Sequence, residues 1–203
     1  NQPGTGAAGC QEHEGNSEME SDAVIRCAWS GSDPLYQAYH DSEWGRPLHG
    51  DVELFERLTL EAFQSGLSWR TILNKRESFR KAFDGFDPNR VAAYGAKEVK
   101  LLMADAGIVR NRKKIEAAIN NAGAVVALRD GGDSLDELIW SFAPDPRPAP
   151  KTGHDLPSAT EESKALAKEL KRRGFVFIGP TTIYALMEAG GLVNDHLAGC
   201  AFR

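Results

Sequence analysis

Apolar residues after Arg26 recur three and four positions apart along most of the chain, which is the spacing of an amphipathic helix. In the segment 51–67 this stripe consists of Leu54, Phe55, Leu58 and Ala62. The same spacing, interrupted by capping residues, proline and glycine, predicts seven further helices at 69–83, 88–94, 97–105, 112–128, 134–142, 158–173 and 180–188. Neither strand pairs nor internal repeats emerge from the pattern. We therefore predict an all-α fold with about eight helices.

Capping signals mark the predicted helix starts, at Asp51, at Asp87-Pro88, and at the capping-box forms 134–137 and 158–161. Residues 143–158 hold five of the ten prolines, which is typical of a connection and not of a helix. We expect this segment to join two closely packed helical lobes.

The last two predicted helices are joined by a short turn, Gly174 to Gly179, with a proline after the second glycine. This arrangement, which covers residues of about 164–190, resembles the helix-hairpin-helix motif of DNA repair proteins. Such a turn exposes the backbone N–H groups of a helix N-terminus, which can bind phosphate without reading sequence. The candidate DNA contacts are Arg172, Arg173, Gly174, Gly179 and Thr181. A simple αα-hairpin is the alternative interpretation.

The net charge of −5 comes from one end of the chain. Residues 1–25 contain five acidic residues and no Lys or Arg, and the rest of the chain carries 24 basic and 24 acidic residues. The first 25 residues are also rich in Gly and Ser, so we predict a disordered acidic tail over 1–25 and a folded domain over 26–203. A balanced domain does not indicate a general nucleic-acid binder, because such proteins usually have a basic excess.

No apolar run approaches the roughly 18 residues of a membrane span, and no signal peptide is visible, so we expect no membrane association. Three cysteines do not form a disulfide framework, which favours a cytoplasmic location. Cys10 and His13 lie in the tail, and we expect no role for them.

Two cysteines and two histidines at the ends of the predicted domain form a candidate metal site. Their spacing is Cys27-x12-His40 and His196-x3-Cys200. This is the ligand set of a closed, tetrahedral zinc site, which is structural. One zinc ion per chain would tie the start of the domain to its end, and we call this a zinc clip. Spacing alone leaves the alternative open, because a buried cysteine often packs as a small hydrophobic side chain.

Eight segments resemble DNA-3-methyladenine glycosylase I, a family of the helix-hairpin-helix glycosylase superfamily. They are Arg26–Trp29, Asp33–Tyr36, Tyr39–Gly45, Leu60–Trp69, Asp105–Arg110, Trp140–Phe142, Arg173–Thr182 and Gly191–His196. The resemblance extends in order from Arg26 to Cys200. It implies a helix-hairpin-helix glycosylase fold and zinc ligands at the four residues named above. It also implies base-excision repair, in which a flipped 3-methyladenine is released by hydrolysis of its N-glycosidic bond.

Glu61 lies on the apolar stripe of the helix predicted at 51–67, where a carboxylate is desolvated unless it has partners. A structural glutamate bonded to a helix end or an arginine is the alternative. The resemblance makes Glu61 the carboxylate that meets the edge of the extruded base, and therefore the candidate catalytic residue. A buried anion suits this lesion, because methylation at N3 leaves the base cationic.

Five large aromatic residues lie within 41 positions: Trp29, Tyr36, Tyr39, Trp44 and Trp69. They can stack on a flipped base or pack in a core. The resemblance assigns all of them except Trp44 to the base pocket.

The resemblance implies a monofunctional enzyme, since no lysine nucleophile is indicated. Asp195 follows the hairpin but adjoins the candidate ligand His196, so we do not expect it to stabilise the sugar cation. The expected partner is duplex DNA with alkylated bases, bound by a monomer, and the loop 66–68 is a candidate to fill the gap left by the base.

Two other functions remain open from the sequence. One is a non-catalytic, zinc-clipped DNA-binding scaffold, against which the presence of Glu61 and Trp69 argues. The other is a glycosylase for a different alkylated base, in which Phe63 alters the volume of the pocket.

Overall fold

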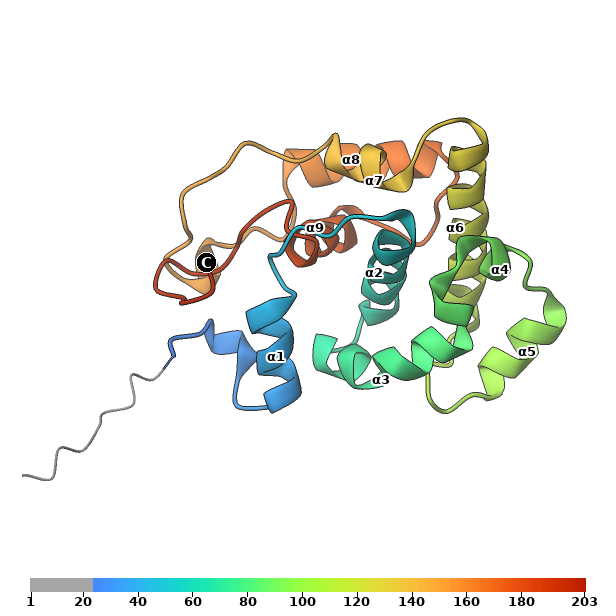
Figure 1. Cartoon of the computed structure of the whole chain (residues 1–203), viewed down its shortest axis with the longest axis horizontal. Helices are drawn as coiled ribbons and strands as arrows, with labels where there is room; N and C mark the ends of the chain where they lie inside the picture. Colours follow the sequence, from blue (N-terminus) through green and yellow to red (C-terminus); the bar gives the residue numbers. More distant parts are fainter. Residues whose placement is uncertain (1–23) are drawn as a thin grey trace, which may run out of the picture.

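The computed structural model describes residues 24–203, which form nine α-helices, three short 3-10 helices and no strand (Figure 1). The all-α prediction is therefore confirmed for this part of the chain. The α-helices are α1 (Pro34–Ser42), α2 (Asp51–Gln64), α3 (Trp69–Ala82), α4 (Pro88–Ala92), α5 (Ala96–Ala104), α6 (Arg112–Asp130), α7 (Leu135–Trp140), α8 (Glu161–Arg172) and α9 (Pro180–Ala189). The predicted tail lies almost wholly outside the described residues.

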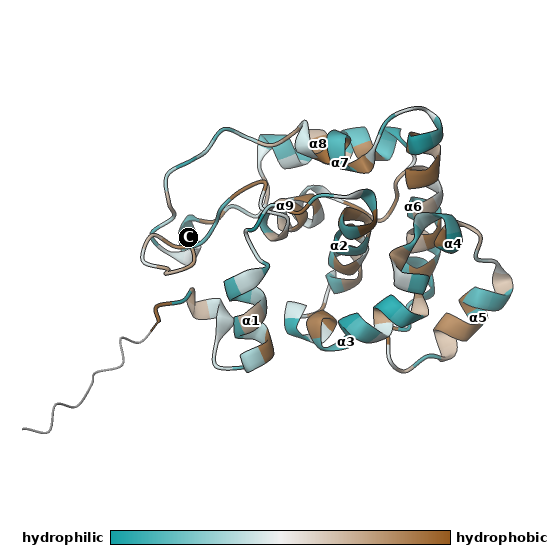
Figure 2. Ribbon diagram, in the orientation of Figure 1, coloured by the Kyte–Doolittle hydropathy of each residue, from teal (hydrophilic) through white to brown (hydrophobic). Residues whose placement is uncertain are grey.

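The core is one contiguous cluster of buried apolar side chains that extends from Tyr39 to Val193. Figure 1 shows α2 and α9 in the middle of the molecule, with α6 beside them and α7 and α8 along one edge. In Figure 2, hydrophobic positions are conspicuous on these central helices, whereas α8 is mostly hydrophilic. Leu54, Phe55 and Leu58 are fully buried, so the apolar stripe predicted for α2 faces the core.

Two of the predicted helix starts are wrong by one or two residues. Gly50 is the N-cap of α2, and Asp51 is its first residue, whose side chain accepts a hydrogen bond from the N–H of Asp136 at 3.0 Å. Thr160, and not Ser158, caps α8 through reciprocal bonds with Ser163 of 2.9 and 3.2 Å. Both errors arise because sequence alone does not show which of several neighbouring polar residues finds a donor.

The start predicted at Asp87-Pro88 is confirmed, with the Asp87 carboxylate accepting from the N–H of Asn89 at 2.9 Å. The same Asp-Pro form occurs at Asp33-Pro34, where it opens α1, a helix that was not predicted. Because α1 is short and rich in aromatic and polar residues, its apolar period is weak.

Helix α2 ends at Gln64, earlier than the predicted Leu67. Lys114 of α6 is buried, and its ammonium donates to the carbonyls of Phe63 at 2.8 Å and Ser65 at 2.6 Å. The chain then turns through Gly66 at φ +83° and enters α3 with Ser68 as N-cap. This turn brings Trp69 back towards the face of α2 that carries Glu61.

Helices α8 and α9 pack against each other and are joined by a hairpin over 173–179. Gly174 adopts φ +93° and Gly179 is the N-cap of α9. Two asparagines of α6 hold the hairpin: Asn120 donates to the Gly174 carbonyl at 2.8 Å, and Asn121 bonds both backbone groups of Val176 at 2.8 and 3.1 Å. The hairpin is therefore a supported turn and not a loose loop.

The two ends of the described chain lie together (Figure 1). The N–H of Ala201 donates to the carbonyl of Ile25 at 2.9 Å. None of the helices within residues 24–203 has the length and apolar character needed to cross a membrane.

Candidate functional site

The four candidate metal ligands converge although the two pairs are far apart in the sequence. One ligand atom from each of Cys27, His40, His196 and Cys200 lies within 4.8 Å of the others, and all four residues are buried. The Sγ of Cys200 is 3.5 Å from His40 Nε2 and 3.4 Å from His196 Nδ1, and the Sγ of Cys27 is 3.8 Å from His196 Nδ1. These four residues could hold one metal ion.

Hydrogen bonds behind the cluster fix the orientation of both imidazole rings. His40 Nδ1 is 2.7 Å from Asp41 Oδ1, and His196 Nε2 is 3.0 Å from the carbonyl of Trp44. Asp41 is itself bound by the Arg26 guanidinium at 2.7 Å. Because the outer nitrogens face acceptors, the inner nitrogens are left with lone pairs that point at the thiols, which is the arrangement expected around a bound metal. Asp41 therefore has a structural role.

The histidines of this candidate metal site pack against two aromatic residues of a pocket. Trp29 packs against His40 with ring centroids 5.1 Å apart, and Trp44 packs against His196 at 4.7 Å. The two indoles meet each other at 4.9 Å. The position of both pocket walls thus depends on the histidines of the cluster.

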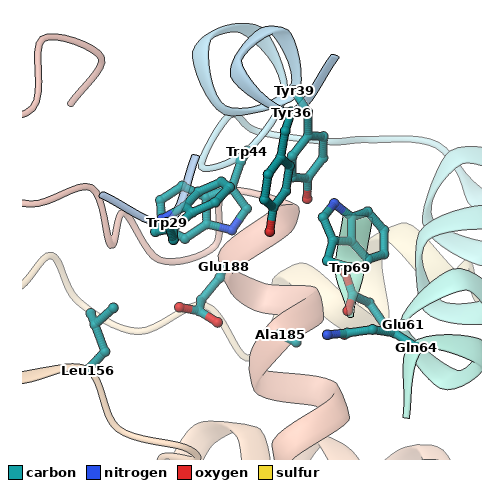
Figure 3. Close-up of a pocket in the computed structure, with 10 residues that line it drawn as sticks. All are labelled: Trp29, Tyr36, Tyr39, Trp44, Glu61, Gln64, Trp69, Leu156, Ala185 and Glu188. Carbon is teal, nitrogen blue, oxygen red and sulfur yellow. The ribbon is translucent and has the colours of Figure 1, made fainter. Parts of the chain in front are cut away.

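The pocket is a cavity of about 210 Å³ between α1, α2, α3 and α9 (Figure 3). It is lined by Trp29, Tyr36, Tyr39, Trp44, Glu61, Gln64, Trp69, Leu156, Ala185 and Glu188. All five residues predicted to bind a base lie here, and so does Trp44, which was left outside the prediction. The other four were missed because they are single residues in segments whose packing no local pattern reveals.

Glu61 approaches the cavity from α2 and is only 5% exposed. Burial raises the pKa of its carboxyl to about 7, an effect that the charge of Arg57 partly opposes. A carboxyl group in this state is close to half ionised at neutral pH. It can therefore become an anion when a cation enters the pocket.

Arg57 contacts two of the aromatic side chains that line the pocket. Its guanidinium donates to the Tyr39 hydroxyl at 2.8 Å and lies over the rings of Tyr39 and Trp69, 5.2 and 5.3 Å from their centroids. Its charge also faces Glu43, which Arg76 binds at 2.5 Å. Glu43 therefore has a structural role.

The indole N–H of Trp69 is buried and has no hydrogen-bond partner within residues 24–203. A buried donor without an acceptor costs free energy on the order of 1–3 kcal/mol, so it is poised to meet an acceptor on a ligand. Phe63, by contrast, packs in the core against Phe79 at 4.8 Å and is not part of the pocket lining. The expectation that Phe63 shapes the pocket is wrong, because two helical positions separate it from Glu61, an offset that points its side chain to the opposite face of α2, into the core.

The hairpin arginines are engaged in ion pairs. Arg172 binds Glu169 at 2.5 Å, and Arg173 bridges Glu169 at 2.8 Å and Asp133 at 2.5 Å. Thr181 is exposed in the first turn of α9, close to Gly179. Any phosphate at this hairpin would thus meet backbone N–H groups directly and the two arginines only by exchange with carboxylates.

Flat aromatic walls, an ionisable buried carboxyl and an unpaired donor suit a planar, nitrogen-rich ring that carries positive charge. The cavity is below the roughly 300–1,000 Å³ of drug-sized sites, which favours a single base. Such a base would lie between indole and phenol rings with its polar edge at Glu61.

Comparisons with known proteins point to one family. The methyladenine glycosylase family model matches residues 29–203. DNA-3-methyladenine glycosylase 1 of Escherichia coli is 48% identical over 178 residues, which cover 86% of this chain and 95% of that protein. A crystal structure of 3-methyladenine DNA glycosylase I is 47% identical, with a TM-score of 0.85, and covers 87% of this chain and 98% of that one. A structure of the glycosylase I from Staphylococcus aureus, solved to explain 3-methyladenine recognition, is 37% identical, with a TM-score of 0.83 and coverage of 88% and 96%.

Proposed function

Because the chain belongs to the methyladenine glycosylase family, we propose that it is a monofunctional DNA glycosylase that releases 3-methyladenine from alkylated DNA. The observation that carries this proposal is the buried Glu61 in a pocket of aromatic rings. The flipped lesion is a cationic purine, and the pocket offers it π faces and a carboxyl that ionises on contact.

Discrimination against normal adenine follows from charge. A neutral adenine gains no ion-pair energy from Glu61 and must still desolvate that carboxyl, whereas a cationic base repays this cost. The cavity of about 210 Å³ favours a base with a small alkyl group over a bulky adduct.

Release of the base needs little help from a general acid, because the positive charge on the ring disappears as the bond to the sugar breaks. The residues of this chain extrude and hold the base, and they leave room for water at the sugar carbon. The developing cation on the sugar is stabilised by the anionic Glu61 and by the DNA phosphates. Glu61 thus serves as a binding residue and as an electrostatic one.

Duplex DNA would be held by the hairpin, which acts as a helix-hairpin-helix motif. The first N–H groups of α9, beside Gly179 and Thr181, would bind a backbone phosphate, with Arg172 and Arg173 flanking it. Leu67, which is 41% exposed in the loop before α3, is suited to fill the gap left in the base stack. A monomer is sufficient, since one chain carries both the pocket and the hairpin.

The metal cluster would hold one structural Zn²⁺. Tetrahedral zinc with Zn–S of about 2.3 Å and Zn–N of about 2.0–2.1 Å separates sulfur from nitrogen by about 3.5 Å. The observed S···N separations of 3.4, 3.5 and 3.8 Å fit this value. Four protein ligands leave no position for a metal-bound water, so the ion would support the pocket walls.

The function is tested by measuring free 3-methyladenine released from methylated duplex DNA by the wild type, Glu61→Gln and Glu53→Gln. Glu53 is exposed on the same helix and serves as the matched control. We expect release by the wild type and the control, and a loss of at least about 100-fold in Glu61→Gln, as for removal of a strong electrostatic contact. No release by the folded, metal-loaded wild type would contradict the proposed function.

A further inference from the structure

Lys114 is a buried cation that neither the proposed chemistry nor the proposed DNA contacts use. It lies in the first turn of α6 and is only 7% exposed. Burial lowers the pKa of its ammonium, which forms no ion pair with any carboxylate of residues 24–203. A buried charge is costly unless it has partners, so the contacts that hold Lys114 in place indicate its role.

One side of the ammonium holds the end of α2, which forms part of the pocket wall. Lys114 donates to the carbonyls of Phe63 at 2.8 Å and Ser65 at 2.6 Å. Gln64 lies between these two residues, and Figure 3 shows it extending into the cavity beside Glu61. The ammonium therefore fixes the backbone from which this wall of the pocket projects.

The other side of the ammonium faces the hairpin. Its Nζ lies 5.9 Å from the centroid of the Phe177 ring, which is a cation–π contact. Asn121 lies seven residues further along α6, on the same face of that helix, and bonds both backbone groups of Val176 at 2.8 and 3.1 Å. One face of α6 thus holds both the end of α2 and the tip of the hairpin.

The backbone of Phe177 shows that the hairpin is fixed at this contact. Phe177 adopts φ +57°, a conformation that a bulky residue rarely takes and that persists only where neighbouring groups enforce it. Phe86 adopts φ +58°, but it is fully buried and stacks on Phe83. Phe177 is 42% exposed, so the contacts with α6 take the place of such a core.

We propose that Lys114 is a positioning residue that fixes the distance between the DNA held by the hairpin and the pocket that receives the base. The inference rests on the proposed function, in which the hairpin binds duplex DNA and a flipped base enters the pocket. The extruded base reaches Glu61 only if the DNA backbone is held at the correct distance from α2. A misplacement of about 1 Å can slow a reaction by about 100-fold.

This role differs from general support of the pocket or of the hairpin. The aromatic walls keep their contacts with Arg57, and the hairpin keeps its hydrogen bonds with Asn120 and Asn121. Without Lys114, each part should therefore still bind its own ligand. Only the step that needs both parts together, release of the base from DNA, should become slow.

The test compares Lys114→Met with Lys113→Met, the same substitution at the exposed neighbouring position. We measure the single-turnover rate of 3-methyladenine release from methylated duplex, the Kd for undamaged duplex, and the Kd for free 3-methyladenine from tryptophan fluorescence. We expect Lys114→Met to slow release by about tenfold or more, while both Kd values change by less than about threefold. Lys113→Met should release the base within about twofold of the wild-type rate.

Two further substitutions keep the inference testable if circular dichroism shows that Lys114→Met does not fold. Lys114→Arg retains the charge but presents a longer, planar group, so we expect it to slow release by about threefold or more. Phe177→Ala removes the hairpin side of the contact and should also slow release. In the double variant Lys114→Met, Phe177→Ala the two effects should not add, because both remove the same link.

Other outcomes overturn the inference in distinguishable ways. If Lys114→Met and Lys114→Arg release the base at the wild-type rate, Lys114 positions nothing, and the proposed function stands. If binding of the free base weakens as much as release does, Lys114 only supports the pocket. If the effects at Lys114 and Phe177 add fully, the two residues do not form one link. If the folded wild type releases no 3-methyladenine, the inference and the proposed function are both wrong.

Discussion

Glu61 links recognition to stability at the scale of a single residue. Its pKa rises from 4.5 to about 7 in the folded protein, so the native state holds a proton more tightly than the unfolded chain. The free energy of unfolding therefore decreases as pH rises from about 4.5 to about 7, and the loss persists at higher pH.

Replacement of Glu61 by Gln should relieve this loss. We expect Glu61→Gln to match the wild type in stability near pH 4.5 and to exceed it at pH 8, on the order of 2–3 kcal/mol. The measurement is urea unfolding at both pH values, with Glu53→Gln as control. If the difference in free energy of unfolding between Glu61→Gln and the wild type is the same at both pH values, burial does not raise the pKa of Glu61.

Two glycines, one at the end of a helix and one within a helix, should respond in opposite ways to replacement by alanine. Gly191, just after α9, adopts φ +72°, and a Cβ there would lie 2.4 Å from the carbonyl carbon of Arg46. At Gly123, in the middle of α6, a Cβ would meet no atom within 4 Å apart from its chain neighbours and the backbone of its own helix. We expect Gly191→Ala to destabilise the protein by about 2–4 kcal/mol and Gly123→Ala to stabilise it by about 0.5–1 kcal/mol.

Thermal unfolding of both variants measures these changes. If Gly191→Ala unfolds at the wild-type temperature, the close approach of the 46–47 segment to the end of α9 is wrong.

In the hairpin between α8 and α9, a carboxylate competes for the two arginines that we propose to flank a DNA phosphate. Glu169 binds Arg172 and Arg173, and the two arginines lower its pKa to about 2. We expect Glu169→Gln to release Arg172 and to free Arg173 from one of its two carboxylate partners. Binding of undamaged duplex should then tighten by about two- to fivefold at low salt, with a steeper salt dependence. The double variant Arg172→Ala, Arg173→Ala should have the opposite effect.

Fluorescence anisotropy over a salt series measures both effects. Equal salt slopes for wild type, Glu169→Gln and the double variant would show that these arginines do not contact phosphate.

A structural feature of this protein can be predicted from the sequence when neighbouring residues determine it, and not when distant parts of the chain do. Helices such as α2 and α6 follow from apolar spacing, because their faces contact a core. The ends of α2 did not follow, since they depend on Lys114 and Asp136, which come from distant parts of the chain. Glu61 was detectable as a charge on an apolar stripe. Glu188 was not, because its pocket-facing position arises only from tertiary packing.

At the scale of the whole molecule, the cluster of Cys27, His40, His196 and Cys200, which we propose to hold a zinc ion, joins the two ends of the fold and packs against the pocket walls. Its histidines pack against Trp29 and Trp44, so loss of the ion should loosen both walls. We expect Cys200→Ser to lower the melting temperature by roughly 10 °C, equivalent to about 3–4 kcal/mol for a domain of this size, and to weaken 3-methyladenine binding.

Metal analysis and thermal unfolding measure this effect, with Cys10→Ser as the matched control. One equivalent of zinc in the wild type and the control, and much less in Cys200→Ser, is the expected result. A wild type that is fully stable without any metal would contradict the role assigned to the cluster.

The convergence of Cys27 with Cys200 also has a consequence for how the chain folds. Contacts between residues so distant in sequence form late, because most of the chain must already be ordered before they can meet. Each pair, Cys27 with His40 and His196 with Cys200, offers only half of a coordination sphere. A chain whose two ends have not yet come together therefore cannot bind the proposed ion tightly. Tight retention of the metal would then identify molecules that have completed folding.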